Sequence, residues 1–370
     1  MKLILSDRHL KKKQEFTSFA DQELDNGAEF PRRNLRKAAE RGLMGLPIPV
    51  EHGGRGEDFL TYILLLEEVS RVCASTGVII AVHTSVGTFP LLYYGSKTQK
   101  EKYLPGLAGG TLLGAFALTE TGAGSDASAL STKAETREEG YILNGSKMFI
   151  TSGGEADLYT LFATVDRSAG RRGITAFLVE NNFQGLSAGP PELKMGLKRS
   201  STTELRLDNM PVPSANLLGK EGEGFNIAMS LLDGGRIGIA AQGLGLARAS
   251  IEYTRLVLKK RDTGKPGTAR DAACLLAELE TRLEAARLLT YRAAVMKGNG
   301  LRCSAEASMA KIFATDLAVG AAVKCMDICG IAHCSAEGKL ARYFCDAKAT
   351  QIYEGTNQIQ RIVVAREMLK

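Results

Sequence analysis

The spacing of the hydrophobic residues changes twice along the 370-residue chain, and this limits the folds that it can adopt. In the first part, apolar residues recur every three or four positions, as over 60–72, which is typical of helices. In the middle part, β-rich runs such as 159–165 and 174–179 alternate with turns. The helical spacing then returns and continues to the C-terminus. The sequence therefore predicts a mainly α protein with a small β domain between two helical domains.

We expect three domains with different architectures. These are an N-terminal helical domain over 1–115, a middle antiparallel β domain over 116–225, and a C-terminal four-helix bundle over 226–370. Strands and helices do not alternate as a parallel sheet requires, which argues against a Rossmann-type nicotinamide enzyme. Inside the β domain, Asn144-Gly145 stands between the β-rich runs 141–143 and 147–151, so we expect a hairpin turn there.

Charge and hydropathy favour a cytoplasmic protein. The formal net charge of +6 is spread along the chain, and we expect the single basic cluster, 11–13, to be a solvated helix face rather than a nucleic-acid patch. No run approaches the ~20 apolar residues that span a bilayer. Residues 1–13 lack the apolar run of a signal peptide. We therefore expect no nucleic-acid partner and no membrane insertion.

The seven cysteines do not form a recognisable framework. They fit a reducing compartment better than a disulfide-linked fold in a chain of this length. Four of them fall close together without a Cys-x-x-Cys pair, and cysteine is also a common core residue, so we expect no metal site. These four are Cys325, Cys329, Cys334 and Cys345.

The first segment that could carry chemistry covers residues 116–126 and reads Phe-Ala-Leu-Thr-Glu-Thr-Gly-Ala-Gly-Ser-Asp. Its glycines would let backbone N–H groups approach a ligand closely. Thr119 and Ser125 add hydroxyls that can donate to a ring carbonyl or a phosphate. By itself the segment is equally compatible with a loop that binds nothing, and it has no Lys placed as in a Walker loop.

Two further segments leave alternatives open. Phe149, followed by Thr151, is a flat aromatic beside a hydroxyl, which suits one face of a planar cofactor, but it is equally compatible with a sheet core. The segment 233–236, Asp-Gly-Gly-Arg, begins the second helical part. Its glycines allow close helix packing, and Arg236 could alternatively bind a phosphate.

The fourth segment, 351–358, reads Gln-Ile-Tyr-Glu-Gly-Thr-Asn-Gln. It would break one helix and begin the next, with Thr356 or Asn357 as the N-cap. A carboxylate at such a junction is ordinarily an exposed loop acid, and the segment alone favours that interpretation of Glu354.

In this order and spacing, the four segments together resemble the acyl-CoA dehydrogenase family of flavoproteins. The resemblance covers essentially the whole chain and is most specific at 118–126 and 351–356. It also includes three shorter matches, at 42–54, 194–196 and 211–213.

The resemblance implies FAD between the β domain and the bundle, and an acyl-CoA beside it. The positions that match the family's flavin contacts are Phe116, Leu118, Thr119, Ser125, Phe149, Thr151, Arg261, Thr356 and Gln358. The positions that match its substrate contacts are Ser125, Asp233, Arg236 and Gly355. Glu354 matches the catalytic base, which removes a proton α to the thioester carbonyl while the β hydride passes to flavin N5. Some members carry the base on the bundle helix, but the matching residue here is Gly235, which strengthens the case for Glu354.

The chain departs from the family pattern in the part where a neighbouring subunit meets the flavin. Arg261-Asp-Thr-Gly lacks the usual Phe, Asp271 and Asp327 replace Gln, and Cys345 replaces Arg. Separately, among the residues that match the cover of the flavin's other side, Phe149 replaces the usual Trp. Three alternatives therefore stay open: an enzyme acting on a carrier-protein thioester, a flavin monooxygenase or nitro-forming relative (which would typically lack the Glu), and a non-catalytic thioester-binding protein. The resemblance also implies an electron-transfer flavoprotein as electron acceptor and a homo-oligomer, either a tetramer or a dimer.

Overall fold

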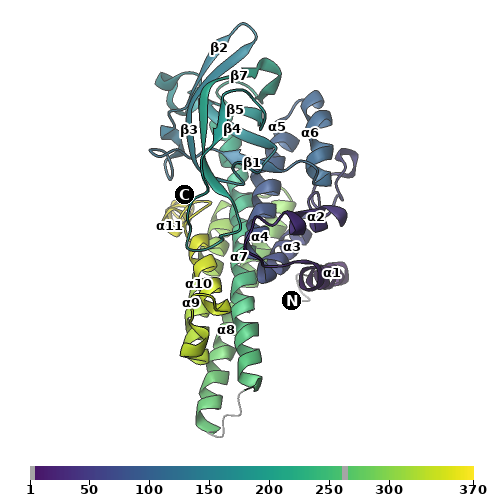
Figure 1. Cartoon of the computed structure of the whole chain (residues 1–370), viewed down its shortest axis with the longest axis vertical. Coiled ribbons are helices and arrows are strands. Elements are labelled where there is room, and N and C mark those ends of the chain that lie inside the picture. Colours follow the sequence, from purple (N-terminus) through teal and green to yellow (C-terminus); the bar gives the residue numbers. More distant parts are fainter. Residues whose placement is uncertain (1–4, 261–265) are drawn as a thin grey trace.

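The architecture is helical at both ends of the chain with a β sheet between, as the hydrophobic spacing predicts. The structure is a computed structural model that describes residues 5–260 and 266–370. In Figure 1 the sheet lies at the top, the long C-terminal helices extend below it, and the N-terminal helices pack on the right. The helix–sheet–helix order is confirmed, while the exact domain boundaries stay a prediction.

The N-terminal part is built from short helices, several of which are apolar and buried. Its elements are α1 (Asp7–Glu23), α2 (Arg32–Glu40), α3 (Phe59–Val72), α4 (Ala74–Val82), a π-helix (His83–Thr88), α5 (Phe89–Tyr94) and α6 (Lys97–Gly109). Asp58 caps α3 by accepting a hydrogen bond from the Thr61 N–H at 2.7 Å. The stretch Ala74–Tyr94 is long and apolar enough to cross a membrane, but 94% of its most apolar window is buried inside the structure. It is therefore a core element of this part of the fold.

The middle part is a single sheet of eight strands. These are β1 (Gly114–Ala117), β2 (Lys133–Arg137), β3 (Gly140–Thr151), β4 (Leu158–Thr164), β5 (Ile174–Glu180), β6 (Leu186–Ala188), β7 (Thr202–Pro213) and β8 (Leu217–Leu218). The order is β6-β7-β3-β2-β4-β5-β8, with β1 beside β4. Most pairs are antiparallel, whereas β1 and part of β2 run parallel to β4.

The hairpin prediction at Asn144-Gly145 is wrong. Strand β3 runs straight through both residues, and the β2–β3 connection lies at 138–139. Gly145 is used for a close approach instead, since a Cβ there would lie 2.8 Å from the Thr132 hydroxyl. The pairing of β3 with β7 shifts register between Leu143 and Gly145. A glycine inside a strand often marks such an irregularity, so Asn-Gly occurs here without a turn.

The C-terminal part is a bundle whose central helix packs on two sides. Its helices are α7 (Gly224–Lys260), α8 (Pro266–Gly298), α9 (Ser304–Cys329), α10 (Lys339–Thr350) and α11 (Asn357–Met368). A Cβ on Gly243 of α7 would lie 2.9 Å from the carbonyl of Ala314 in α9, and one on Gly245 would lie 2.5 Å from the carbonyl of Glu67 in α3. Glycines therefore let α7 lie close to both the bundle and the N-terminal helices.

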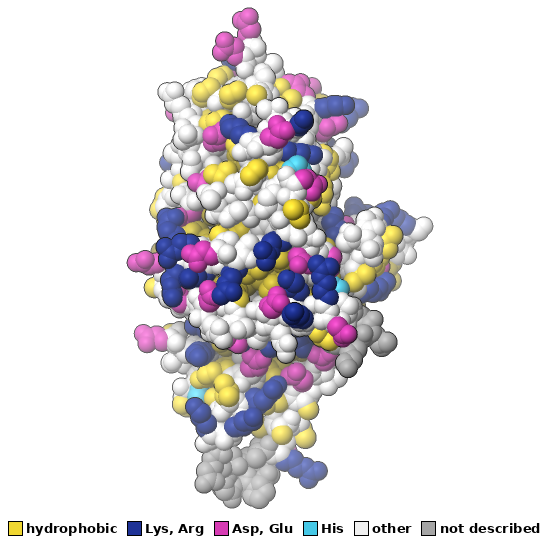
Figure 2. Space-filling view, turned by 90° about the vertical axis from the view of Figure 1, so that its right-hand side faces the viewer, with side chains coloured by type: hydrophobic (Ala, Val, Ile, Leu, Met, Phe, Trp, Pro, Cys, Tyr) yellow, Lys and Arg dark blue, Asp and Glu magenta, His cyan; other side chains and the backbone are white. Residues whose placement is uncertain are grey.

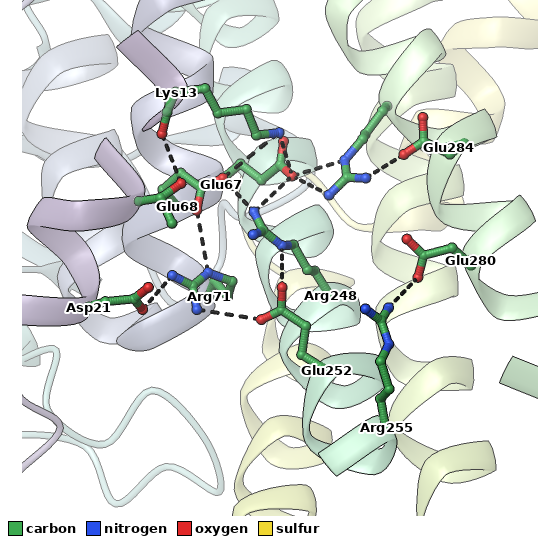
Figure 3. A network of polar contacts seen from close by, with 12 residues as sticks. Lys13, Asp21, Glu67, Glu68, Arg71, Arg248, Glu252, Arg255, Glu280 and Glu284 are labelled. Atoms are coloured by element: carbon green, nitrogen blue, oxygen red, sulfur yellow. Dashed lines mark hydrogen bonds and ion pairs between the residues drawn. The ribbon is translucent and has the colours of Figure 1, made fainter. Parts of the chain in front are cut away.

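A buried charge network joins α1, α3, α7 and α8 (Figure 3). Glu67 is fully buried and accepts hydrogen bonds from Arg287 at 2.8 and 2.9 Å, from Lys13 at 3.1 Å and from the Tyr291 hydroxyl at 2.5 Å. Burial alone would raise the pKa of Glu67, but these cations and the Tyr291 bond hold it well below its usual range.

The basic cluster at 11–13 is therefore not simply a solvated face. Lys11 is exposed, but Lys13 reaches inward to Glu67 and Lys12 pairs with Glu57 at 3.3 Å. Figure 2, which faces the side that the N-terminal helices form, shows Lys and Arg side chains in a band across the middle of this face, with Asp and Glu among them.

We expect Glu67→Gln to lower the free energy of unfolding by about 3–5 kcal/mol, because it leaves Arg287 without its buried carboxylate and removes the nearer of the two buried carboxylates from Lys13. The Glu67 contribution is present above the unfolded pKa of a Glu and is lost as the pH falls. In urea unfolding, the difference in the free energy of unfolding between wild type and variant should therefore become smaller at acidic pH. Glu135→Gln is the control: the pair that Glu135 forms with Arg137 is more than half exposed, so its loss should cost at most about 1 kcal/mol. Equal effects of the two variants would contradict this account.

Candidate active site

Glu354 lies in a left-handed turn between α10 and α11. Its φ is +55° and that of Gly355 is +84°. The left-handed region costs a residue with a Cβ roughly 1–2 kcal/mol, so surrounding contacts have to hold this turn in place. The Tyr353 hydroxyl donates to Gln242 of α7, and Thr356 caps α11 by accepting from the Ile359 N–H at 3.3 Å. The N-cap prediction is confirmed for Thr356.

The Glu354 carboxylate lies directly over Gly235 of α7. A Cβ on residue 235 would be 2.6 Å from its Oε2 atom. The sequence presents Gly235 as an empty alternative position for the base. The structure shows that the carboxylate from the turn occupies the space beside it, so a side chain at 235 and Glu354 in this position exclude each other.

Burial and two cations act on Glu354 in opposite directions. Burial raises its pKa above the ordinary value, while Arg236 of α7 and Lys311 of α9 partly lower it again. The side chain keeps some accessible surface, so it is neither the exposed loop acid that the segment alone suggests nor a fully enclosed group. A carboxylate with a raised pKa is suited to accept a proton near neutral pH.

Arg236 faces inward rather than toward solvent. Arg236 is 8% exposed, and its side chain pairs with Asp233 at 2.9 Å. Asp233 also accepts a hydrogen bond from the Ser304 hydroxyl at 2.7 Å. The Arg236 Nε–H is buried without a partner among the described residues. The structure therefore brings Asp233, Arg236 and Glu354 together at one end of α7.

The glycine loop of the first segment is open on its outer side. A Cβ on Gly122 or on Gly124 would meet nothing within 4 Å, and Ser125 is exposed. The loop follows β1, in which Phe116 is half-buried, and the Thr119 carbonyl accepts a hydrogen bond from the Met148 N–H at 2.8 Å. The loop thus leaves open space beside its two glycines, whereas Leu118 of the same segment is buried.

A buried ion pair that the sequence did not reveal anchors this loop. Lys147 of β3 is fully buried and pairs with Glu120 at 2.6 Å, and it donates to the Leu118 carbonyl at 3.3 Å. Burial lowers the pKa of Lys147 to about 8, against the attraction of Glu120. Although burial opposes it, Lys147 and the hydroxyl of Thr132 lower the pKa of Glu120 to about 2. The only sequence signal was a Lys on a β-rich run at an inward-facing position.

Phe149 is not part of the sheet core. Its side chain is 61% exposed and its φ is +56°, so the strand backbone is distorted where it turns this ring outward. Thr151 is half-buried at the end of β3, Thr356 is half-buried, and Gln358 is exposed on α11. Of the alternatives for Phe149, the structure excludes the core and leaves an aromatic face available to a ligand.

The β domain meets the bundle at Asp346 of α10. Its Oδ1 accepts the Leu197 N–H at 2.6 Å, and a Cβ on Gly196 would lie 2.1 Å from the carbonyl of Cys345, so this contact requires the glycine of the matched 194–196 motif. Asp346 is 7% exposed, and burial raises its pKa to about 6.

The structure describes some of the residues that depart from the family pattern and leaves out others. Arg261 and the rest of its altered motif lie outside the described residues. Asp271 and Asp327 are both exposed. Within 5–260 and 266–370, no group of three His, Cys, Asp or Glu side chains could hold a metal ion.

Comparison with known proteins decides the family. The N-terminal, middle and C-terminal domain models of acyl-CoA dehydrogenases match residues 8–111, 115–210 and 222–369. The chain belongs to the acyl-CoA dehydrogenase family. Together the three matches span nearly the whole chain, as the resemblance of the motifs predicts.

Several relatives are similar over almost their full length. An acyl-CoA dehydrogenase of Bacillus subtilis is 51% identical over 92% of this chain and 90% of its own. The structure of butyryl-CoA dehydrogenase from Megasphaera elsdenii superposes with a TM-score of 0.94 at 39% identity, covering 99% of both chains. A chain of the structure described as the electron transferring flavoprotein of Acidaminococcus fermentans superposes with a TM-score of 0.97 at 42% identity, covering 100% of both. A prolyl acyl carrier protein oxidase also shares the fold, with a TM-score of 0.94 at 33% identity over 98% and 99% of the two chains.

We expect Asp346→Asn to stabilise the protein at alkaline pH. The folded-state pKa of Asp346, about 6, lies above that of an unfolded Asp, so wild type loses stability as the pH rises through this range. The Asn oxygen can still accept the Leu197 N–H but carries no buried charge. Thermal unfolding should show an advantage of the variant that is larger, by about 3 kcal/mol, near pH 8 than near pH 4. A pH-independent difference would contradict the assignment.

Proposed function

We propose that this chain catalyses the α,β-dehydrogenation of a short-chain acyl-CoA with FAD as cofactor and Glu354 as the base. One observation supports the assignment of the base: the Glu354 carboxylate lies directly over Gly235 and faces Arg236 and Lys311. Family membership supports the reaction class, and the similarity to a butyryl-CoA dehydrogenase supports a short acyl group.

The residues present fit a flavin. The open glycine loop, the hydroxyls of Thr119 and Ser125, and the outward ring of Phe149 offer space, donors and an aromatic face on the β domain. Further donors are Thr151, Thr356 and Gln358. When bound, FAD supplies the acceptor for the β hydride. The protein's part is to place the substrate and to hold the base.

The turn also presents a donor for the thioester carbonyl. Within the part of the chain that the structure describes, the main-chain N–H of Glu354 has no hydrogen-bond partner. A donor aimed at a carbonyl oxygen that gains negative charge can contribute roughly 3–4 kcal/mol to the transition state. Glu354 would thus serve twice, with its N–H on the carbonyl oxygen and its carboxylate on the α proton.

Asp233 and Arg236 are proposed to line the substrate side of this site, with Gly355 and Ser125. Because Arg236 is buried against Asp233, its contribution is a fixed positive charge near the reacting end of the thioester rather than a flexible contact with solvent-exposed phosphates. A fixed charge at this place suits the thioester of an acyl-CoA and that of a carrier protein equally well. Experiment therefore has to distinguish the two substrates.

Partners follow from the family and from the surface. We propose an electron-transfer flavoprotein as acceptor and a homo-oligomer, a tetramer or a dimer. Large apolar side chains remain exposed on the bundle helices, which supports burial by a second copy. They include Leu288, Val295, Phe313 and Val323. The cytoplasmic location stays a prediction.

We expect the purified holoenzyme to be yellow and its flavin to bleach anaerobically with butyryl-CoA. Glu354→Gln should still bind FAD and acyl-CoA but reduce the flavin at least about 10²-fold more slowly, because it removes the base and keeps its shape. Glu337→Gln, at an exposed acid before α10, is the control. Stopped-flow absorbance of the flavin measures all three. Normal reduction by Glu354→Gln would refute the base, and bleaching by acyl carrier protein thioesters alone would favour the carrier alternative.

We expect Gly235→Ala to slow flavin reduction by roughly 10- to 100-fold, because the added Cβ would displace the Glu354 carboxylate. Gly234→Ala is a matched control on the same helix, since its Cβ would meet only ordinary contacts at 3.8 Å. The two rates, compared at saturating butyryl-CoA, should differ while FAD content stays the same. Equal rates would show that the carboxylate does not depend on this close approach.

A further inference from the structure

A second fully buried lysine lies under the catalytic turn and has no role in the mechanism above. Lys311 of α9 is 0% exposed. Its Nζ donates to the Gly355 carbonyl at 2.7 Å and to the Asn357 side-chain oxygen at 3.1 Å. Among the described residues it forms no ion pair, unlike Lys147, whose buried ammonium is paired with Glu120. Burying a charge is costly. A buried ammonium that donates to a backbone carbonyl, without a carboxylate partner, therefore calls for a functional explanation.

The carbonyls of both left-handed residues, Glu354 and Gly355, accept hydrogen bonds from a buried side chain. Gln360 of α11, also 0% exposed, donates its amide to the Gly355 carbonyl at 2.9 Å and to the Glu354 carbonyl at 3.3 Å. The other end of the Gln360 amide accepts from the Ser308 hydroxyl of α9 at 2.9 Å. Gly355 therefore accepts from two donors, of which only Lys311 carries a charge.

Lys311 also fixes the start of α11 through Asn357. The Asn357 amide donates to Asp316 at 2.7 Å and to the Thr315 hydroxyl at 2.9 Å, both on α9. Its oxygen accepts from Lys311. Without the ammonium, the Asn357 oxygen would lose this donor and the Gly355 carbonyl would keep one of its two.

The charges that face Lys311 come from three elements. They are Glu354 in the turn, Arg236 on α7 and Asp316 on α9 itself, which also pairs with Arg361 at 3.2 Å. Burial lowers the pKa of Lys311 to about 7, and Glu354 is the strongest influence in the opposite direction. Each of the two groups therefore favours the charged form of the other.

We propose that Lys311 is a positioning residue for the dehydrogenation: it holds the left-handed Glu354–Gly355 turn in its productive shape and supplies a positive charge that faces the Glu354 carboxylate. The proposal rests on the proposed function, since it takes Glu354 to be the base. It differs from a purely structural role because it predicts a change in the ionisation of Glu354 as well as a lower rate.

The test compares Lys311→Met with wild type as FAD-loaded holoenzyme, using stopped-flow flavin reduction by butyryl-CoA across a pH range that covers both ionisations. The rate at alkaline pH should fall by roughly 10- to 100-fold, since small displacements of the reacting groups are that costly. The apparent pKa of the limb on which the rate rises with pH should increase by about 1 unit, because an opposite charge is lost. The affinity for butyryl-CoA should change little, because Lys311 lies beneath the turn.

Two controls separate charge from hydrogen bonding. Lys324→Met makes the same substitution at an exposed position of α9 and should leave rate and profile unchanged. Gln360→Met removes the neutral donor to the same carbonyl and should lower the rate without moving the apparent pKa. If Lys311→Met does not fold, Lys311→Gln, which keeps a donor and loses the charge, should show the same shift in pKa.

If an active Lys311→Met or Lys311→Gln enzyme kept the wild-type apparent pKa of the rising limb, the proposal would be overturned. An equal shift of this apparent pKa in Gln360→Met would overturn it as well. Failure of both Lys311 variants to fold would also overturn it, because Lys311 would then be a determinant of stability. Absence of flavin reduction in wild type with every acyl-CoA would instead refute the proposed function, so the two failures are distinguishable.

Discussion

Buried donors from α9 and α11 bind the carbonyls of the left-handed turn at Glu354 and Gly355. A residue with a Cβ does not adopt this conformation without cost, and isolated from its surroundings the segment would relax. The hold comes from Lys311 and Gln360, and from Asn357 at the start of α11. The position of the Glu354 carboxylate over Gly235 and its raised pKa both depend on the turn keeping this shape.

The same chain buries ionisable groups in three different ways, and the comparison shows what each is for. Glu67 is surrounded by cations and connects the N-terminal helices to the bundle. Lys147 is paired one to one with Glu120 and supports the glycine loop that follows β1. Lys311 has no carboxylate in contact among the described residues, and Glu354 is the strongest of the charges that favour its ammonium form. Full pairing suits stability, whereas incomplete pairing leaves a group that responds to its neighbours.

Several features of the fold followed from local patterns, and others did not. The order of helices and strands and the cap at Thr356 were predictable because hydrophobic period and capping are properties of neighbouring residues. The Asn144-Gly145 hairpin was not, because a two-residue turn signal inside a strand looks the same when the glycine serves a close approach to Thr132. Lys13 looked like surface for a similar reason: its partner Glu67 is distant in sequence and close only in the folded chain.

By itself, the sequence determined the family and the order of the domains, because these depend on motifs and hydrophobic patterns that lie in continuous stretches of chain. It left Glu354 undecided between loop acid and base when taken alone, and it left Phe149 undecided between core and cofactor face. Only the tertiary structure decided where these side chains lie, by placing Gly235, Arg236 and Lys311 around the Glu354 carboxylate and by turning the Phe149 ring outward. The physical reason is that burial and electrostatic environment are set by which helices pack together, and no local pattern records that.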